Sequence, residues 1–240
     1  MNKSKIKKRK YFKIFPLFLS LKMEKNLIIS KTITFVKKQL INAESGHDWF
    51  HIERVYKNAQ LIAKNEKVDL LIVKLAALLH DIADSKFHNG DENIGPKRAT
   101  RFLDSLDIDS EKAHHIVNII ANMSFSKNIE KKAKFNSLEL QVVQDADRLD
   151  AIGAIGIART FNYGGFKNRT IYNPEIKPNL NMTKEEYKKS TAPTINHFYE
   201  KLLLLKDKMN TKTGKKIAAQ RHNFMEIFLN QFYDEWNGLK

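Results

Sequence analysis

Apolar residues recur three and four positions apart in almost every patterned segment after Met23. No segment alternates apolar and polar residues in the way that a half-buried strand does. The pattern therefore predicts an all-α protein. We expect helices near residues 26–44, 48–66, 69–84, 92–106, 110–123, 137–162, 192–209 and 213–236.

Local signals support several of these helix starts. Asp69 and Asp109 each precede an apolar-periodic run and are expected to act as N-caps. Asn136 with Glu139 resembles a capping box. No linker divides the chain after Met23, so one domain over residues 23–240 is predicted.

Two segments read as loops because they are rich in Gly, Asn, Pro and charged residues: residues 86–93 and 164–181. Loops on a rigid helical scaffold often carry substrate contacts. The glycines at 153 and 156 are expected to allow close helix packing, since no strand precedes them as in a phosphate-binding loop.

Composition sets limits on the chemistry. The chain has 240 residues, of which 42% are apolar, enough to bury a sizeable core. Cysteine is absent, which excludes disulfides, thiolate nucleophiles and cysteine-based zinc sites. A cytoplasmic protein is expected, and any metal must be bound by nitrogen and oxygen.

The formal charge of +15 suggests a polyanionic partner, but much of the excess lies in one segment. Residues 1–22 carry eight basic side chains and no acidic one. Their apolar stretch is short and interrupted by Pro16, so neither a membrane span nor a secretory signal is predicted. We expect a disordered basic extension, with contact to an anionic membrane surface left open.

The dipeptide His80-Asp81 follows the apolar run 75–79. A buried imidazole beside a carboxylate is costly without a partner, and a divalent metal would provide one. His51 and Asp147, each on its own predicted helix, are the candidate co-ligands. Each residue alone is more often a core histidine or a salt-bridge partner, but the combination favours metal binding.

Two imidazoles and two carboxylates suit an ion that keeps water positions open, which implies catalysis rather than a structural role. Mn or Mg is favoured, and Fe, Co or Ni would also fit this donor set. Metal-assisted hydrolysis is the expected chemistry. Asp81 is assigned a catalytic role as a ligand, and Asp84 is the candidate to orient or deprotonate the attacking water.

Longer stretches resemble a known family. They are GHDWFHIERV at 46–55, LAALLHDIAD at 75–84, VQDADRLDAIGAIGIART at 143–160, Tyr-Gly-Gly at 163–165 and the C-terminal run 197–236. From about residue 25 to the end, the chain resembles the HD-domain metal-dependent phosphohydrolases, and within them the YpgQ-like and YedJ-like bacterial subgroup. The resemblance implies a helical HD bundle with long substrate-side loops and a C-terminal helical extension.

The resemblance also implies that His51, His80, Asp81 and Asp147 bind one divalent ion. It suggests hydrolysis of nucleoside triphosphates to nucleoside monophosphate and pyrophosphate. An HD-type phosphodiesterase or alarmone hydrolase remains the alternative. The chain departs from the subgroup at Met123, where a histidine is expected, so a phosphate-binding role for that position is in doubt.

Phosphate substrates need cations, and a base needs an apolar surface on which to stack. The candidate substrate-binding residues are Arg54, Lys86, Arg148, Tyr163, Arg169, Lys206 and Arg221. As alternatives, Arg54 and Arg148 pair with nearby acids such as Glu53, Asp145 or Asp150, and Lys206 lies on a solvated face. From another class, a non-catalytic nucleic-acid or membrane binder that uses the basic extension remains open, although a nucleic-acid partner is not favoured. The sequence predicts no oligomeric state.

Overall fold

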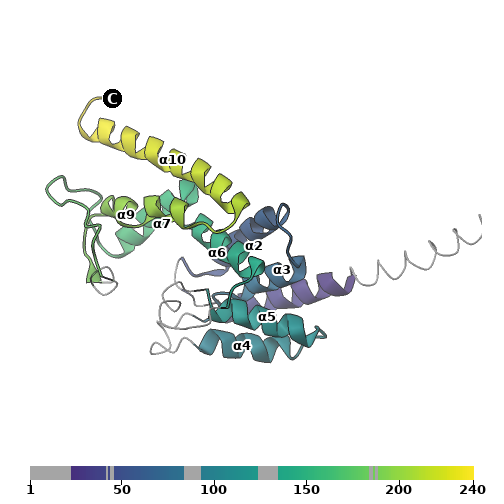
Figure 1. Ribbon diagram of the computed structural model, residues 1–240. Helices are drawn as coiled ribbons and strands as arrows, with labels where there is room; N and C mark the ends of the chain where they lie inside the picture. The colour runs from purple at the N-terminus through teal and green to yellow at the C-terminus, as the bar shows by residue number, and fades with distance from the viewer. Residues whose placement is uncertain are drawn as a thin grey trace, which may run out of the picture.

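The computed structural model describes residues 23–41, 43, 46–83, 93–123, 135–183, 186 and 189–240, and all regular structure in these ranges is helical (Figure 1). This confirms the all-α prediction. A first helix covers residues 23–39. It is followed by α2 (Trp49–Ala63), α3 (Leu70–Leu79), α4 (Ile94–Leu103), α5 (Ser110–Ala121), α6 (Leu138–Asp150), α7 (Gly153–Phe166), α9 (Asn196–Glu200), a 3-10 helix (Leu202–Lys208) and α10 (Lys212–Trp236).

The core is built around α3. Its sequence LLIVKLAALL is apolar on almost every side, and only Leu70 and Lys74 of the helix escape full burial. A helix that is hydrophobic all round must be covered on all faces. Helices α2, α5 and α6 provide this cover.

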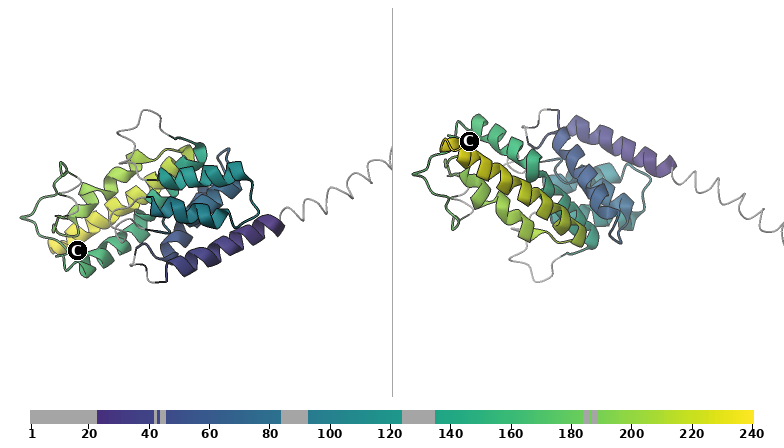
Figure 2. Two further views of the ribbon diagram at one scale, coloured as in Figure 1. Left: turned by 90° about the horizontal axis from the view of Figure 1, so that it is seen from below. Right: turned by 90° about the horizontal axis from the view of Figure 1, so that it is seen from above.

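The remaining helices extend the bundle at two ends (Figures 1 and 2). The first helix and α4 lie at one end, and α7, α9 and α10 lie at the other. Aromatic side chains hold the second end together. They are Phe161 of α7, Tyr172 of the following loop, Phe198 of α9, and Phe228, Phe232, Tyr233 and Trp236 of α10.

The single helix predicted over 137–162 is wrong, because the chain forms two helices there. Ile152 is extended and Gly153 has a φ of +78°, a conformation that favours glycine. Gly156 then packs directly on the backbone of Ala151, where a Cβ atom would clash. The expected close packing at Gly156 is therefore confirmed, and it allows the chain to turn between α6 and α7.

Two other predicted helices are also shorter than expected. The helix predicted over 69–84 ends at Leu79, so His80 and Asp81 lie in the turn that follows. The one predicted over 192–209 is divided at Lys201 into α9 and the 3-10 helix. Leu202 and Leu205 are buried there three residues apart, which matches the three-residue repeat of a 3-10 helix.

Two of the three predicted helix caps are confirmed, and one is wrong. Asp69 and Asp109 accept backbone N–H groups of α3 and α5, as predicted. The capping box at Asn136 is wrong, because Ser137 is the N-cap of α6. Glu139 instead accepts the backbone N–H of Asp69 and so ties α6 to the start of α3.

The C-terminal helices are fastened to α6 through one buried carboxylate. Asp145 is fully buried and accepts the backbone N–H of Asn210, the backbone N–H of Thr211 and the Thr211 hydroxyl at 2.7–2.8 Å. Gly214 packs against the same carboxylate so closely that a Cβ atom would not fit between them. The start of α10 is thereby fixed to Asp145 of α6, which lies two positions before Asp147 in the sequence.

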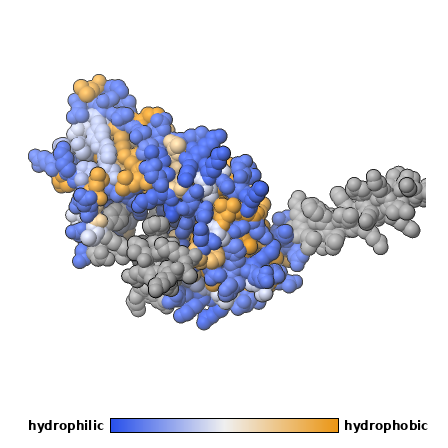
Figure 3. All heavy atoms as spheres, in the orientation of Figure 1, coloured by the Kyte–Doolittle hydropathy of each residue, from blue (hydrophilic) through white to orange (hydrophobic). Residues whose placement is uncertain are grey.

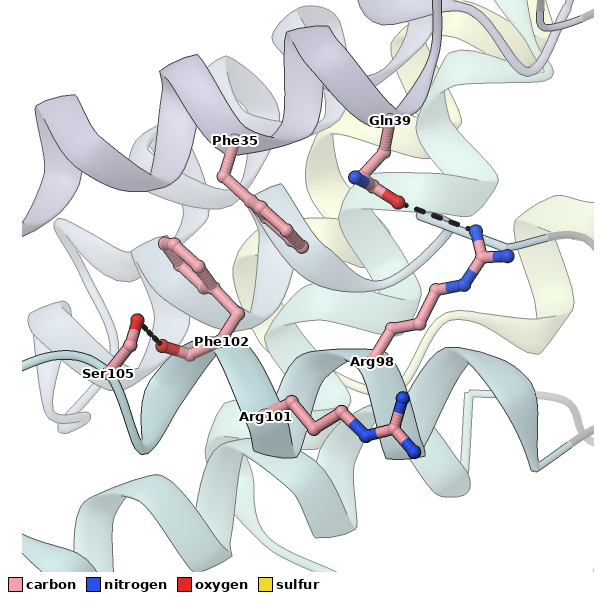
Figure 4. A pocket seen from close by; sticks show the side chains of 6 residues that line it. All are labelled: Phe35, Gln39, Arg98, Arg101, Phe102 and Ser105. Atoms are coloured by element: carbon pink, nitrogen blue, oxygen red, sulfur yellow. Dashed lines mark hydrogen bonds between the residues drawn. The ribbon is translucent and has the colours of Figure 1, made fainter.

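The surface in Figure 3 is mostly hydrophilic, with hydrophobic residues gathered in small patches. Within the described residues, no helix combines the length and the apolar character needed to cross a bilayer. A groove of about 510 Å³ lies between the first helix and α4 (Figure 4). It is lined by Phe35, Gln39, Arg98, Arg101, Phe102 and Ser105, none of which is a predicted metal ligand.

Candidate metal centre

His51 lies in the first turn of α2, with its side chain only 4% exposed. Asp48, the N-cap of this helix, accepts the backbone N–H of His51. The imidazole Nδ1 lies 2.8 Å from Oδ2 of Asp150. Because a carboxylate can only accept, the ring donates from Nδ1, which leaves the lone pair of Nε2 free to bind a metal.

His80 follows the last residue of α3, and its side chain is 5% exposed. Its Nδ1 lies 2.9 Å from the carbonyl oxygen of Ala77. A carbonyl oxygen also only accepts, so His80 too presents the Nε2 lone pair. Both histidines are therefore fixed in the tautomer that suits a ligand.

Asp147 of α6 faces both imidazoles. Its Oδ1 lies 3.6 Å from Nε2 of His51 and 3.9 Å from Nε2 of His80. Two atoms that each bind one ion at about 2.1 Å can be up to about 4.2 Å apart, so both separations suit a shared ion. The Asp147 side chain is 43% exposed, so the site opens to solvent.

Asp81 completes the group. His51, His80 and Asp81 can each contribute a ligand atom such that these atoms lie within 4.8 Å of one another. The structure thus brings both histidines close to Asp81 of the turn after α3 and to Asp147 of α6. Two imidazoles and two carboxylates fit a divalent ion with open coordination positions.

Asp150 accepts hydrogen bonds from His51 and from two arginines. Its buried carboxylate accepts Nε of Arg54 at 2.6 Å and Nη1 of Arg159 at 2.6 Å, in addition to the bond from His51. Burial alone would raise the pKa of Asp150, but the hydrogen bonds from His51 and Arg54 and the charge of Arg159 hold this pKa well below its usual range. Asp150 therefore stays ionised and remains an acceptor for His51.

Asp81 has its own partner, His47, whose Nδ1 lies 2.6 Å from Oδ2 of Asp81. Burial would raise the pKa of Asp81, but the hydrogen bond from His47 and the nearby imidazoles lower it. His47 was not predicted from the sequence as a site residue. The available signal was the segment GHDWFH, which contains a second His-Asp pair just before His51.

Arg159 is a second residue that sequence reasoning missed. It stands in the otherwise apolar stretch AIGAIGIART, with no spacing that links it to the ligands. In the structure it bonds both the side chain of Asp150 and the backbone oxygen of Gly46. The signal, a single cation on an apolar helix, was too general to identify this role.

Several predicted substrate-binding cations have protein partners. Arg54 forms a two-pronged pair with Asp150, and Arg148 pairs with Asp145 at 3.2 Å. Arg221 donates to the Leu149 carbonyl and to Asn58 Oδ1, so it ties α10 to α6 and α2. For Arg54 and Arg148, these are the pairings with acids that the sequence left open as the alternative.

The other predicted substrate residues lie elsewhere. Arg169 donates to the Ser190 carbonyl and its guanidinium stands 5.7 Å from the ring centre of Tyr163, which is half-exposed. Lys206 lies 3.5 Å from Asp207. Asp84 and Lys86 lie outside the described residues.

Comparisons with known proteins identify the family of the chain. Residues 49–152, which include all four candidate ligands, match the HD domain family model. YpgQ of Bacillus subtilis (strain 168) is 38% identical over 206 residues, which cover 86% of this chain and 92% of the relative. The chain therefore belongs to the HD-domain family and is an HD-superfamily hydrolase, a class that implies metal-dependent phosphohydrolysis.

Solved structures point the same way. An HD-superfamily hydrolase from Bacillus thuringiensis superposes with a TM-score of 0.72 and 47% identity, covering 89% of this chain and 98% of that one. Bacillus subtilis YpgQ in complex with ADP superposes with a TM-score of 0.70 and 34% identity, covering 88% of this chain and 96% of that one. The match extends beyond the HD domain model into the C-terminal helices.

Proposed function

We propose that this protein hydrolyses nucleoside triphosphates to nucleoside monophosphate and pyrophosphate through a metal-activated water. The observation that carries the proposal is the convergence of His51 Nε2 and His80 Nε2 on one carboxylate oxygen of Asp147. No packing role requires two oriented imidazoles to face an exposed acid. Membership in the HD superfamily of hydrolases supports the same chemistry.

In this proposal His51, His80, Asp81 and Asp147 hold one divalent ion, for which we propose Mn or Mg. When bound, such an ion polarises a phosphate oxygen and makes water a usable nucleophile at neutral pH. Asp150 and the Ala77 carbonyl hold the two imidazoles in place, so the ligands need little rearrangement. The exposed side of Asp147 is where a phosphate would approach.

A nucleotide substrate is supported by the relative YpgQ, which has been crystallised with ADP. Within this chain, α7 offers a surface for a base. Tyr163 follows Arg159 by four residues and so lies on the helix face that borders Asp150. Because Arg169 stands beside the Tyr163 ring, this surface combines an aromatic plane with positive charge.

The test is product identification with purified protein and Mn or Mg. The panel includes nucleoside triphosphates, dinucleoside polyphosphates, cyclic nucleotides, alarmones and simple phosphate esters. Reaction in water enriched in heavy oxygen places the label in the monophosphate if attack occurs at the α-phosphorus and in pyrophosphate if it occurs at the β-phosphorus. We expect monophosphate and pyrophosphate as products.

Asp147→Ala should abolish this activity, whereas Asp104→Ala, an exposed acid of the turn after α4, should not change it. Cleavage of only cyclic nucleotides or alarmones would replace the proposal by the phosphodiesterase or alarmone hydrolase alternative. Full activity in Asp147→Ala would contradict the metal centre itself.

A further inference from the structure

The segment Gly46-His47-Asp48 before α2 is fixed at each of its residues. Gly46 has a φ of +107°, and its carbonyl oxygen accepts Nη2 of Arg159 at 2.9 Å. Asp48 caps α2 through the backbone N–H of His51. His47 is therefore held between two anchored neighbours, and its side chain has little freedom to leave the metal centre.

Nδ1 of His47 makes a 2.6 Å hydrogen bond with Oδ2 of Asp81. The carboxylate only accepts, so His47 donates. The His47 side chain is 38% exposed, and exposed ion pairs stabilise a fold little. The bond from His47 is therefore better explained by the orientation of Asp81 as a metal ligand than by stabilisation of the fold.

The bonds form a chain that links two ligands. It runs from His51 to Asp150, from Asp150 to Arg159, from Arg159 to the Gly46 carbonyl, and then through His47 to Asp81. Each member is fixed by the next, although the residues come from the loop before α2, the turn after α3, and helices α2, α6 and α7. The position of Asp81 thereby depends on the same network that orients His51.

We infer that His47 is a positioning residue of the metal centre, which fixes one carboxylate oxygen of Asp81 so that the group presents its remaining lone pairs to a divalent ion. The inference rests on the proposed metal-dependent function. It assigns His47 a role in metal affinity, because His47 is the one side chain among the described residues that donates a hydrogen bond to Asp81.

Three variants of the full-length chain separate this role from others. Asn places an amide donor near the position of the imidazole Nδ1, Gln places it near Nε2, and Ala removes it. Manganese affinity is measured by calorimetry with Mn²⁺ alone, and the thermal melting temperature reports on folding. Steady-state kinetics with a nucleoside triphosphate then divide effects between KM and kcat.

We expect His47→Asn to bind Mn²⁺ within about threefold of the wild type, and His47→Gln and His47→Ala to bind it about 10–100-fold more weakly. Melting temperatures without metal should stay close to that of the wild type. Mn²⁺ affinity that is equal in all four proteins, or as weak in His47→Asn as in His47→Ala, would overturn the inference.

A His47→Asn variant that binds Mn²⁺ normally but has a lower kcat would also overturn the inference, because the imidazole itself would then take part in the reaction. Failure of the proposed function looks different. In that case the wild-type protein itself binds no Mn²⁺ or hydrolyses no phosphate substrate.

Discussion

The carboxylate of Asp150 accepts the Nδ1–H of His51 at 2.8 Å, although the two residues are 99 positions apart in the sequence. This bond decides which nitrogen of His51 faces the centre. A ligating histidine is typically oriented through its other nitrogen in this way. The orientation of His51 as a metal ligand therefore depends on Asp150, which does not itself face the proposed ion.

Replacement of Asp150 tests this dependence. Asp150→Ala should weaken Mn²⁺ binding about 10–100-fold, because His51 loses its orienting acceptor. It should also lower the free energy of unfolding by about 3–5 kcal/mol, since Arg54 and Arg159 lose their shared counter-charge. Calorimetry and urea unfolding measure the two effects. Asp104→Ala is the control, and unchanged Mn²⁺ affinity in Asp150→Ala would show that His51 needs no such support.

The turn between α6 and α7 gives a matched pair of glycines. Gly156→Ala should destabilise the protein by about 1–3 kcal/mol, because the added Cβ meets the Ala151 backbone. Gly165→Ala, in the last turn of the same helix, meets no atom within 4 Å. It should be neutral or stabilise by up to about 1 kcal/mol. Thermal unfolding compares the two, and equal effects would contradict the close packing.

His197 predicts a pH dependence of stability. Burial lowers its pKa to about 4, helped by the charges of Lys201 and Arg169. The unfolded chain, with an ordinary histidine pKa of about 6.5, therefore binds the proton more tightly. Stability should be highest above about pH 6.5 and fall as the pH drops toward 4, by up to about 3 kcal/mol at about 1.4 kcal/mol per pKa unit.

Urea unfolding between pH 4 and 7 checks this prediction. His197→Gln should flatten the profile over that range, whatever its effect on stability at neutral pH. His114→Gln, on the exposed side of α5, is the control and should keep the wild-type profile. A slope that survives in His197→Gln would assign the dependence to other groups.

The helical class and the His80-Asp81 pair were predicted from local patterns, whereas the full set of four ligands was implied by the resemblance to the HD-domain family. The run before His80 has the composition of a buried helix, and a His-Asp pair there needs a partner. The network behind these residues was not predictable in the same way. His47 reaches Asp81 across 34 positions and Arg159 reaches Gly46 across 113, so only the folded chain brings them together.

The missed break at residues 151–153 has a different origin. The apolar spacing of three and four continues through this segment, and periodicity alone cannot detect a turn that keeps the pattern in phase. The two glycines indicated close packing but not a change of direction. The positive φ of Gly153 and the contact of Gly156 with Ala151 became evident only in the structure.

The anchorage of Asn210 and Thr211 on Asp145 has a consequence for how the protein can be divided. A fragment of residues 49–152 alone would keep every candidate ligand. It would, however, remove three hydrogen-bond donors from the buried carboxylate of Asp145, two positions before Asp147. An uncompensated charge of that kind is poorly tolerated inside a protein. We therefore expect residues 49–152 to need the start of α10 in order to fold stably.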